Sequence, residues 1–345
     1  MTESKAMIVG CAGTAFSDDE IDFISRERPW GLILFARNIG TAEEIRALTA
    51  QFRSVVERED APVFIDQEGG RVQRIREPIT RHRYPSGAEV GALYRADREA
   101  GLRAARAMSR LHAADLRPLG ITADCLPVLD VPVEGAHDVI GDRAYGHDPD
   151  TVATLGREAA EGLLEGGVLP VIKHIPGHGR AFSDSHKALP VVDTPLAALR
   201  AHDFPPFAAL AGMPMAMTAH VVYAAIDPER PATTSPTVLR DIIRGEIGFD
   251  GLLMSDDVSM HALSGDFGQR TESIFGAGCD VVLHCNGVMD EMKAVAAQTP
   301  VLQGKAMERA QAALSRLADH DGRLDDTAHV AGLRDELDGF FTAVA

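Results

Sequence analysis

The chain of 345 residues is poor in cysteine and in positive charge. Its four cysteines lie in or beside apolar runs without metal-finger spacing, so we expect buried free thiols rather than disulfides. They are Cys11, Cys125, Cys279 and Cys285. Only 34 Lys and Arg face 51 Asp and Glu, a formal net charge of −17. This balance disfavours nucleic acid and anionic membrane surfaces as partners, because both attract a surplus of Lys and Arg.

A long apolar run is also missing from the start of the chain. The first residues, MTESKAMIVGCAG, place acidic and polar groups around a short apolar stretch. Such a segment is neither a signal peptide nor a membrane span. Together with the expected free thiols, it predicts a cytoplasmic protein.

What the sequence does contain is a series of short apolar runs of the kind found in strands buried on both faces. The eight predicted strands are Ala6–Cys11, Gly31–Phe35, Pro62–Asp66, Ile121–Asp130, Leu169–His174, Pro214–Thr218, Gly251–Ser255 and Cys279–Cys285. Segments with apolar residues at three- and four-residue spacing alternate with them and predict helices. Examples are Thr41–Glu57, Arg95–Ala114, Asp150–Glu165, Leu196–Leu210 and Ser235–Glu246.

Eight strands alternating with helices predict an α/β fold, a single (β/α)₈ barrel. A doubly wound open sheet is the alternative, but GCAGTAF after the first strand does not form a G-x-G-x-x-G turn. We expect one domain over residues 1–345, with a core of about 6–300. The remainder, 301–345, predicts two C-terminal helices, Lys305–Leu317 and Ala331–Thr342.

Charged residues gather just after the predicted strands, where a barrel of this kind carries its active site. They comprise Asp66, Glu68, Arg71 and Arg74 after the third strand, Asp130, Asp138, Asp142 and Arg143 after the fourth, Lys173 and His174 ending the fifth, His220 after the sixth, and Asp256 and Asp257 after the seventh. So many converging polar groups predict an active site rather than ordinary loop polarity.

Some of these residues have a second interpretation. Asp142 and Arg143 are alternatively a structural ion pair, and Asp257 has either a direct or a supporting role. Lys173 is more clearly a site residue, because an unpaired lysine at the end of a buried strand is unfavourable. We expect the glycines at 69, 70, 177 and 179 to form turns that let the backbone approach a ligand.

Three motifs in order resemble glycoside hydrolase family 3. They are DQEGGRVQR at 66–74, KHIPGHG at 173–179 followed by DSHKALP at 184–190, and GFDGLLMSDDVSM at 248–260. The similarity runs from about Gly31 to about Asn286 and is greatest to the single-domain bacterial β-N-acetylglucosaminidases of peptidoglycan recycling. D-S-H at 184–186 matches the pattern by which that branch supplies a histidine acid/base from a barrel loop.

The resemblance implies a role for each matching residue. Asp256 is the expected nucleophile, and His186 with Asp184 the expected acid/base pair. Asp66, Arg74, Arg143, Lys173 and His174 match the family's sugar contacts. Such a set suits retaining hydrolysis, which needs a nucleophile and a proton donor on either side of the scissile bond. A carboxylate beside a histidine fixes its tautomer and favours its charged form.

The resemblance therefore implies a retaining β-N-acetylhexosaminidase without cofactor or metal, acting on terminal β-linked N-acetylglucosamine in muropeptides or chitooligosaccharides. A β-glucosidase or β-xylosidase of the same family is the alternative within glycosidases. A metal-dependent hydrolase on the same barrel is another, since Lys173, His174, His178, His186, His220 and Asp256 gather at strand ends. Such hydrolases carry a His-x-His pair at the end of the first strand, and this sequence has none there. A sugar-binding barrel without catalysis is the third, although it has no use for the SDD and DSH elements.

Overall fold

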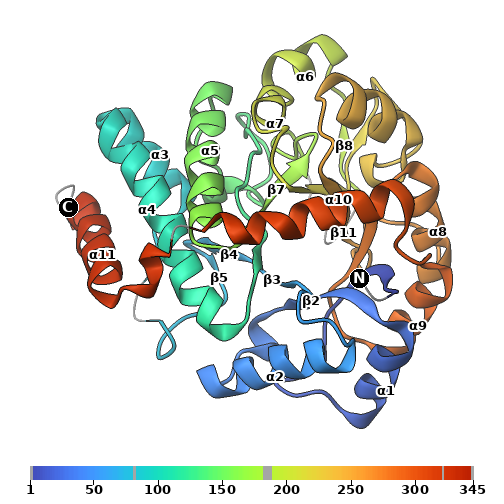
Figure 1. Cartoon of the computed structure of the whole chain (residues 1–345). Coiled ribbons are helices and arrows are strands. Elements are labelled where there is room, and N and C mark those ends of the chain that lie inside the picture. Colours follow the sequence, from blue (N-terminus) through green and yellow to red (C-terminus); the bar gives the residue numbers. More distant parts are fainter. Residues whose placement is uncertain (1–2, 81–82, 182–188, 321, 343–345) are drawn as a thin grey trace.

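Eight parallel strands close into a barrel at the centre of the molecule, a computed structural model that describes residues 3–80, 83–181, 189–320 and 322–342 (Figure 1). In pairing order they are β1 (Lys5–Val9), β12 (Val281–His284), β11 (Leu252–Asp257), β9 (Met215–Thr218), β7 (Leu169–Ile175), β6 (Ala123–Asp124), β3 (Val63–Ile65) and β2 (Pro29–Leu34). Every residue of β2 and β7 is buried, because both faces of each strand are covered. The predicted (β/α)₈ barrel is confirmed.

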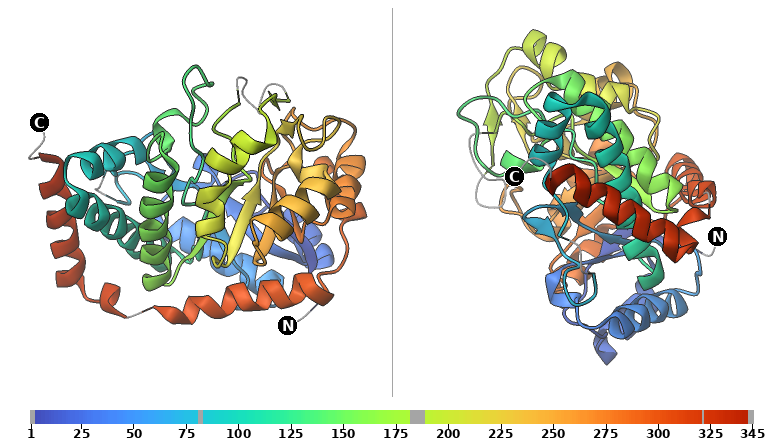
Figure 2. Two further views of the ribbon diagram at one scale, coloured as in Figure 1. Left: turned by 90° about the horizontal axis from the view of Figure 1, so that it is seen from above. Right: turned by 90° about the vertical axis from the view of Figure 1, so that its left-hand side faces the viewer.

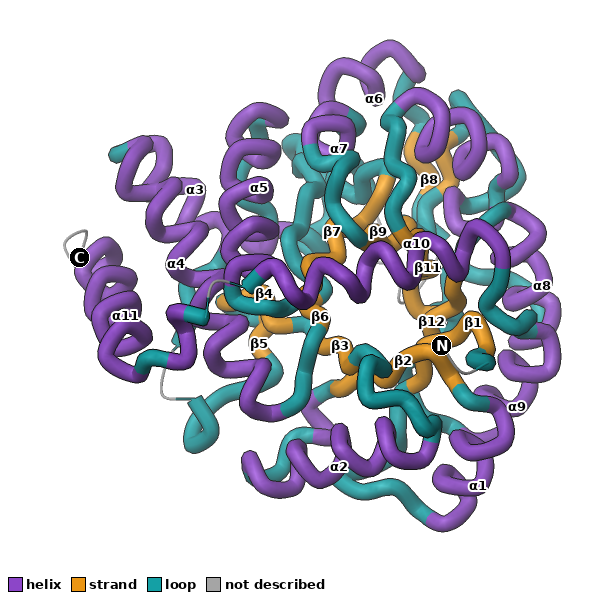
Figure 3. The backbone as a smooth tube through the Cα atoms, viewed as in Figure 1, coloured by secondary structure: helices purple, strands orange, loops and turns teal. Residues whose placement is uncertain are grey.

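Helices surround the strands on the outside of the barrel (Figure 3). They are α1 (Asp18–Glu27), α2 (Ala42–Val55), α3 (Gly87–Ala96), α4 (Arg98–Leu116), α5 (Pro149–Glu165), α6 (Leu196–His202), α7 (Pro205–Ala209), a π-helical segment (Val238–Glu246), α8 (Phe267–Ala277) and α9 (Met289–Gln298). Several begin with a capping box, in which the side chain before the helix and the side chain three residues later each accept the backbone N–H of the other residue. Thr41 and Glu44 form one before α2, and Ser86 and Glu89 another before α3.

The last two helices lie outside the repeating pattern, as α10 (Gly304–Ser315) and α11 (Thr327–Thr342). Helix α10 runs along the side of the barrel where the strands begin, opposite the long loops (Figure 2). Arg309 of α10 binds there to Asp280, just before β12, at 2.9 Å. Helix α11 packs on α4, where Arg334 lies 2.8 Å from Asp115. Neither of these two helices therefore covers the carboxyl ends of the strands, where a site is expected.

Two predicted helices are each two helices in the structure. Asp97 interrupts the segment predicted from Arg95 because its side chain accepts hydrogen bonds from the first amides of α4. Pro205 interrupts the segment predicted from Leu196, because a proline inside a helix clashes with the preceding turn. In both cases a local preference prevails over the apolar spacing.

The predicted fourth strand, Ile121–Asp130, is also wrong over most of its length. Only Ala123–Asp124 pairs as the strand β6. Pro127 follows and has no amide hydrogen to donate to a neighbouring strand, so regular pairing ends before it. The remaining apolar residues are still buried, and an isolated bridge joins Val128 to Lys173.

Two short strand pairs lie near the carboxyl ends of the barrel strands. The strands β4 (Gln67–Gly69) and β5 (Val72–Gln73) form a hairpin after β3, and β8 (Val191–Val192) pairs with β10 (Val222–Tyr223). All four cysteines are buried free thiols, as expected. None of the described helices is both long and apolar enough to cross a membrane.

Candidate active site

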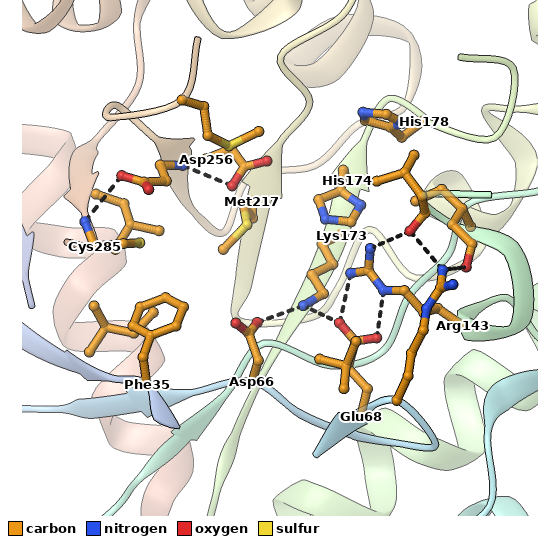
Figure 4. Close-up of a pocket in the computed structure, with 18 of the residues that line it drawn as sticks. Phe35, Asp66, Glu68, Arg143, Lys173, His174, His178, Met217, Asp256 and Cys285 are labelled. Carbon is orange, nitrogen blue, oxygen red and sulfur yellow. Dashed lines mark hydrogen bonds and ion pairs between the residues drawn. The ribbon is translucent and has the colours of Figure 1, made fainter. Parts of the chain in front are cut away.

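A cavity of about 440 Å³ opens at the carboxyl ends of the strands, within the usual size range of small-molecule sites (Figure 4). Charged side chains form one part of its wall and apolar side chains another. The charged and polar residues are Asp66, Glu68, Arg71, Arg74, His137, Asp138, Arg143, Lys173, His174, His178, Asp256 and Asp257. The apolar ones include Ile33, Phe35, Val72, Met217, Met260 and Leu283.

Lys173 is the centre of a buried ion-pair cluster at the inner end of the cavity. Its ammonium lies 2.8 Å from Asp66 Oδ1 and 2.6 Å from Glu68 Oε1, and its side chain is 2% exposed. A buried lysine would be costly alone, but two carboxylates compensate its charge. This arrangement agrees with the prediction that Lys173 belongs to the site, since its side chain also lines the cavity.

Arg143 and Arg74 extend the cluster on either side. Arg143 makes a bidentate contact with Glu68, with both nitrogen–oxygen distances at 2.8 Å. Arg74 lies 3.1 Å from Asp66. The alternative in which Asp142 pairs with Arg143 is wrong, because Asp142 instead lies 3.1 Å from Arg71.

Every group of this cluster is charged at neutral pH. Burial opposes ionisation of the two carboxyls, but the adjacent cations outweigh it. They hold the pKa of Asp66 well below its usual range and lower that of Glu68 to about 2. Burial likewise opposes the charge of Lys173, yet the two carboxylates raise its pKa. The cluster therefore offers charge-assisted donors and acceptors to a polar ligand.

His174 lines the same cavity and is held by a buried aspartate. Its Nδ1 lies 2.6 Å from Asp130 Oδ2, so Nδ1 carries a proton. The other oxygen of Asp130 accepts the backbone N–H of His178 at 2.6 Å. Burial would raise the pKa of Asp130, but the two histidines lower it to about 2. Asp130 thus orients both the imidazole and the turn that follows β7.

His178 is a further cavity residue. Its ring centroid lies 5.7 Å from that of His174, in an edge-on arrangement. Burial lowers its pKa to about 4, so the ring is neutral near pH 7.

Asp256, the last residue but one of β11, faces the cavity from a different side than Arg143 and Glu68 (Figure 4). Its Oδ1 accepts the backbone N–H of Asp257 at 2.8 Å. The Asp257 carboxylate accepts from the backbone of Cys285 at 3.1 Å and from the Ser259 hydroxyl at 2.5 Å. Of the two roles left open for Asp257, its contacts favour the supporting one.

The glycines predicted to form turns allow close backbone approaches. A Cβ on Gly179 would lie 2.1 Å from the carbonyl oxygen of Val131, and one on Gly69, where φ is +95°, would lie 2.2 Å from that of Pro85. No larger residue fits either position. These contacts hold the turns after β3 and β7 against the loops beside them.

Asp184 and His186 lie outside the described residues. The chain on either side of them is anchored: Arg180 lies 2.7 Å from the buried Asp203, and the Pro190 carbonyl accepts the Val222 amide at 2.9 Å. Within the described ranges, no group of three or more His, Cys, Asp or Glu side chains is arranged to hold a metal ion.

Residues 2–319 match the family model described as the glycosyl hydrolase family 3 N terminal domain. The chain belongs to glycosyl hydrolase family 3. The predicted family and the predicted class of enzyme, a glycoside hydrolase, are confirmed.

Individual family members are similar over most of the chain. A β-hexosaminidase from Chromobacterium violaceum is 39% identical over 307 residues, covering 88% of this chain and 85% of that protein. NagZ from Neisseria gonorrhoeae, solved in complex with N-trifluoroacetyl-D-glucosamine, superposes with a TM-score of 0.86 at 30% identity and covers 98% of both chains. A family 3 β-N-acetylglucosaminidase from a Paenibacillus species has a TM-score of 0.83 at 30% identity, with 91% of this chain matched to 61% of that longer one.

The structure brings together the described residues that were predicted as nucleophile and sugar contacts. Asp66, Arg74, Arg143, Lys173, His174 and Asp256 all line the one cavity. Sequence reasoning counted Glu68 and Asp130 among the polar groups at the strand ends but gave them no role, and it named His178 only as a metal ligand in the alternative hydrolase. It also missed the apolar wall, including Phe35, over whose ring Arg74 stacks at 5.4 Å. Apolar residues at strand ends carry no signal that separates a cavity wall from the core.

Proposed function

We propose that this chain is a retaining exo-glycosidase that releases terminal, non-reducing, β-linked N-acetylglucosamine. The observation that carries the proposal is the position of Asp256, whose carboxylate faces the same cavity as the buried cluster of Lys173, Glu68 and Arg143. A carboxylate on a rigid strand end suits nucleophilic attack on a sugar held by the cluster. The relatives named β-hexosaminidase and β-N-acetylglucosaminidase support N-acetylglucosamine as the sugar.

In the proposed reaction, Asp256 attacks the anomeric carbon and forms a glycosyl ester while the leaving oxygen takes a proton. Water then cleaves the ester with net retention of the β configuration. Lys173, His174, Arg143, Asp66 and Arg74 hold the ring hydroxyls through charge-assisted hydrogen bonds. Because Lys173 and Glu68, which line the cavity, are themselves almost completely buried, we expect a terminal sugar to fit against them better than an internal one.

The buried carboxylates Glu68, Asp66 and Asp130 are unsuited to the role of proton donor. The pKa of Glu68 is about 2 and that of Asp66 lies lower still, so neither carries a proton at neutral pH. Asp130 has a pKa of about 2 and is committed to His174. This favours the histidine of the D-S-H motif, His186, as acid/base with Asp184 as its partner, since histidine titrates near neutrality.

We further propose that the physiological substrates are cell-wall fragments, 1,6-anhydro-muropeptides, that reach the cytoplasm during peptidoglycan recycling. The buried free thiols agree with a reducing cytoplasm.

Parallel assays with the nitrophenyl β-glycosides of N-acetylglucosamine, glucose and xylose test the substrate assignment. We expect the N-acetylglucosaminide to have the highest kcat/KM. A higher value for the glucoside or xyloside would establish the family alternative instead. Activity that disappears with a chelator and returns with stoichiometric zinc would favour the metal-dependent hydrolase.

A further inference from the structure

His220 lies behind Asp256 and is not part of the cavity wall. It follows β9 and is completely buried. Its Nε2 lies 3.0 Å from the backbone carbonyl oxygen of Asp257, and its Nδ1 lies 2.7 Å from the Thr233 hydroxyl. The ring therefore bridges the loop after β9 and the end of β11.

The contacts determine the tautomer of His220. A carbonyl oxygen only accepts hydrogen bonds, so Nε2 must carry the hydrogen. Burial lowers the pKa of His220, which keeps the ring neutral and makes Nδ1 an acceptor. The Thr233 hydroxyl then donates its one hydrogen to Nδ1. The Ala219 carbonyl, 3.0 Å from the same hydroxyl, is a competing acceptor for that hydrogen. The buried Thr218 hydroxyl, 2.8 Å away, donates in turn to the Thr233 oxygen. A directed chain of hydrogen bonds ends on the Asp257 carbonyl.

Asp257 is held on all its polar groups. Its carbonyl accepts from His220 and from the Met260 amide at 3.1 Å, and its carboxylate accepts from the Cys285 amide after β12 and from Ser259. Its own N–H donates to Asp256 Oδ1 at 2.8 Å. The direction of that N–H, and with it the orientation of the Asp256 carboxylate, follows from how the Asp257 backbone is fixed.

We propose that His220 is a positioning residue for Asp256: by holding the Asp257 carbonyl it orients the Asp257 amide that grips the nucleophilic carboxylate. The inference rests on the proposed function, in which Asp256 attacks the sugar. The groups proposed to hold the sugar come from β7 and from the segments after β3, β5 and β6, whereas the hydrogen bonds of the His220 ring go to Thr233 and Asp257. The effect of a change at His220 therefore falls on the chemical step rather than on sugar binding.

Two amide substitutions separate positioning from simple filling of space. Glutamine at 220 places its amide N–H near the position of Nε2 and keeps the donor to Asp257, whereas asparagine reaches only the position of Nδ1. We expect His220→Asn to lower kcat about 10²-fold, because a small misplacement of a reacting group costs that much. His220→Gln should keep kcat within a few-fold of wild type. In both variants KM and the inhibition constant of free N-acetylglucosamine should stay within about twofold.

His284→Asn is the matched control. His284 is equally buried on β12, but its Nε2 contacts Glu291 of α9 at 3.0 Å, outside the barrel. Its loss should lower the melting temperature and leave kcat unchanged. Thr233→Val, which removes the donor to Nδ1 without touching the Asp257 contact, should lower kcat less than His220→Asn and serves if the asparagine variant does not fold.

The outcomes distinguish the inference from the proposed function beneath it. Wild-type kcat in folded His220→Asn, or equal losses in the glutamine and asparagine variants, would overturn the positioning role. The same holds if kcat falls only in proportion to stability, as in the His284 control. Asp256→Ala, measured in parallel, tests the proposed function itself. If this variant retains activity, Asp256 is not the nucleophile, irrespective of the results for the His220 variants.

Discussion

The Lys173 ammonium lies 2.6 Å from Glu68 Oε1, and both side chains are buried at the inner end of the cavity. Glu68 is also bound by both arms of the Arg143 guanidinium. The site is therefore built on a compensated cluster of charges, in which each member keeps its neighbour ionised. Removing one charge from such a buried cluster destabilises a protein more than removing one partner of an ion pair on the surface.

Replacing Lys173 with methionine should lower the free energy of unfolding by about 3–5 kcal/mol, because it leaves Asp66 and Glu68 buried side by side with less compensating charge. Urea denaturation measures this loss. Lys305→Met on the exposed face of α10 is the control and should change stability by at most about 0.5 kcal/mol. Adding Glu68→Gln to Lys173→Met should cost less than the sum of the two single changes, since the pair is in direct contact. Additive losses would contradict the ion pair.

Asp130→Asn should weaken sugar binding through His174. Asparagine has only one acceptor oxygen, so either the Nδ1–H of His174 or the backbone N–H of His178 loses its partner. A hydrogen bond to a charged group contributes about 1.5–3 kcal/mol, so we expect KM to rise roughly 10- to 150-fold. Steady-state kinetics on the nitrophenyl N-acetylglucosaminide measures it. An unchanged KM would mean that His174 does not bind the sugar in the tautomer described.

The stability of the protein should fall as the pH drops from about 6.5 to about 4. Burial lowers the pKa of His178 from 6.5 to about 4, so in this range the unfolded chain binds a proton that the folded chain does not. Proton uptake on unfolding favours the unfolded state increasingly at lower pH. His178→Gln should therefore flatten the dependence of the unfolding free energy on pH over this window. His220, whose pKa burial also lowers, keeps part of it.

Denaturation midpoints across the window, for wild type and variant, give the measurement. His261 is exposed, and His261→Gln should reproduce the wild-type slope. Equal slopes in wild type and His178→Gln would show that His178 is not held neutral. Below about pH 4 a further loss is expected, because the carboxyls of Glu68 and Asp130 bind protons in the unfolded chain while their pKa values of about 2 keep them charged in the folded one.

His186→Ala should lower kcat/KM about 10²–10⁴-fold on substrates with poor leaving groups. A dinitrophenyl aglycone leaves without protonation, so acid assistance of glycosylation predicts a smaller loss of kcat/KM for this substrate. Comparing a series of aryl N-acetylglucosaminides of different leaving-group pKa measures the dependence. The same loss for every aglycone would count against His186 as the proton donor.

The barrel was predictable because its strands are buried on both faces, and continuous apolar runs such as GLLMS and PVFID indicate that environment locally. Helix ends were harder to predict. Asp97 and Pro205 divide helices whose apolar spacing continues across the break, so the local capping and steric terms decide against the pattern.

The positions of the site residues could be predicted, but their partners could not. A charged residue at or just after the end of a buried strand indicates the carboxyl end of a barrel, and Asp66, Lys173 and Asp256, predicted on this ground, all line the cavity. That Arg143 pairs with Glu68, 75 residues away, rather than with adjacent Asp142 depends on how two loops meet in space. The contact between His220 and the Asp257 carbonyl likewise joins different strands, and a backbone acceptor has no signature in the sequence.

The central claim is that Asp256 forms a covalent bond with the sugar. A 5-fluoro N-acetylglucosaminyl fluoride slows both steps but its good leaving group lets the first proceed, so the ester of a retaining enzyme accumulates. Digestion and mass spectrometry should then find the added sugar on Asp256 in the wild-type protein and none in Asp256→Asn. A label on another residue, or an unlabelled enzyme that releases the α-anomer first, would contradict the account.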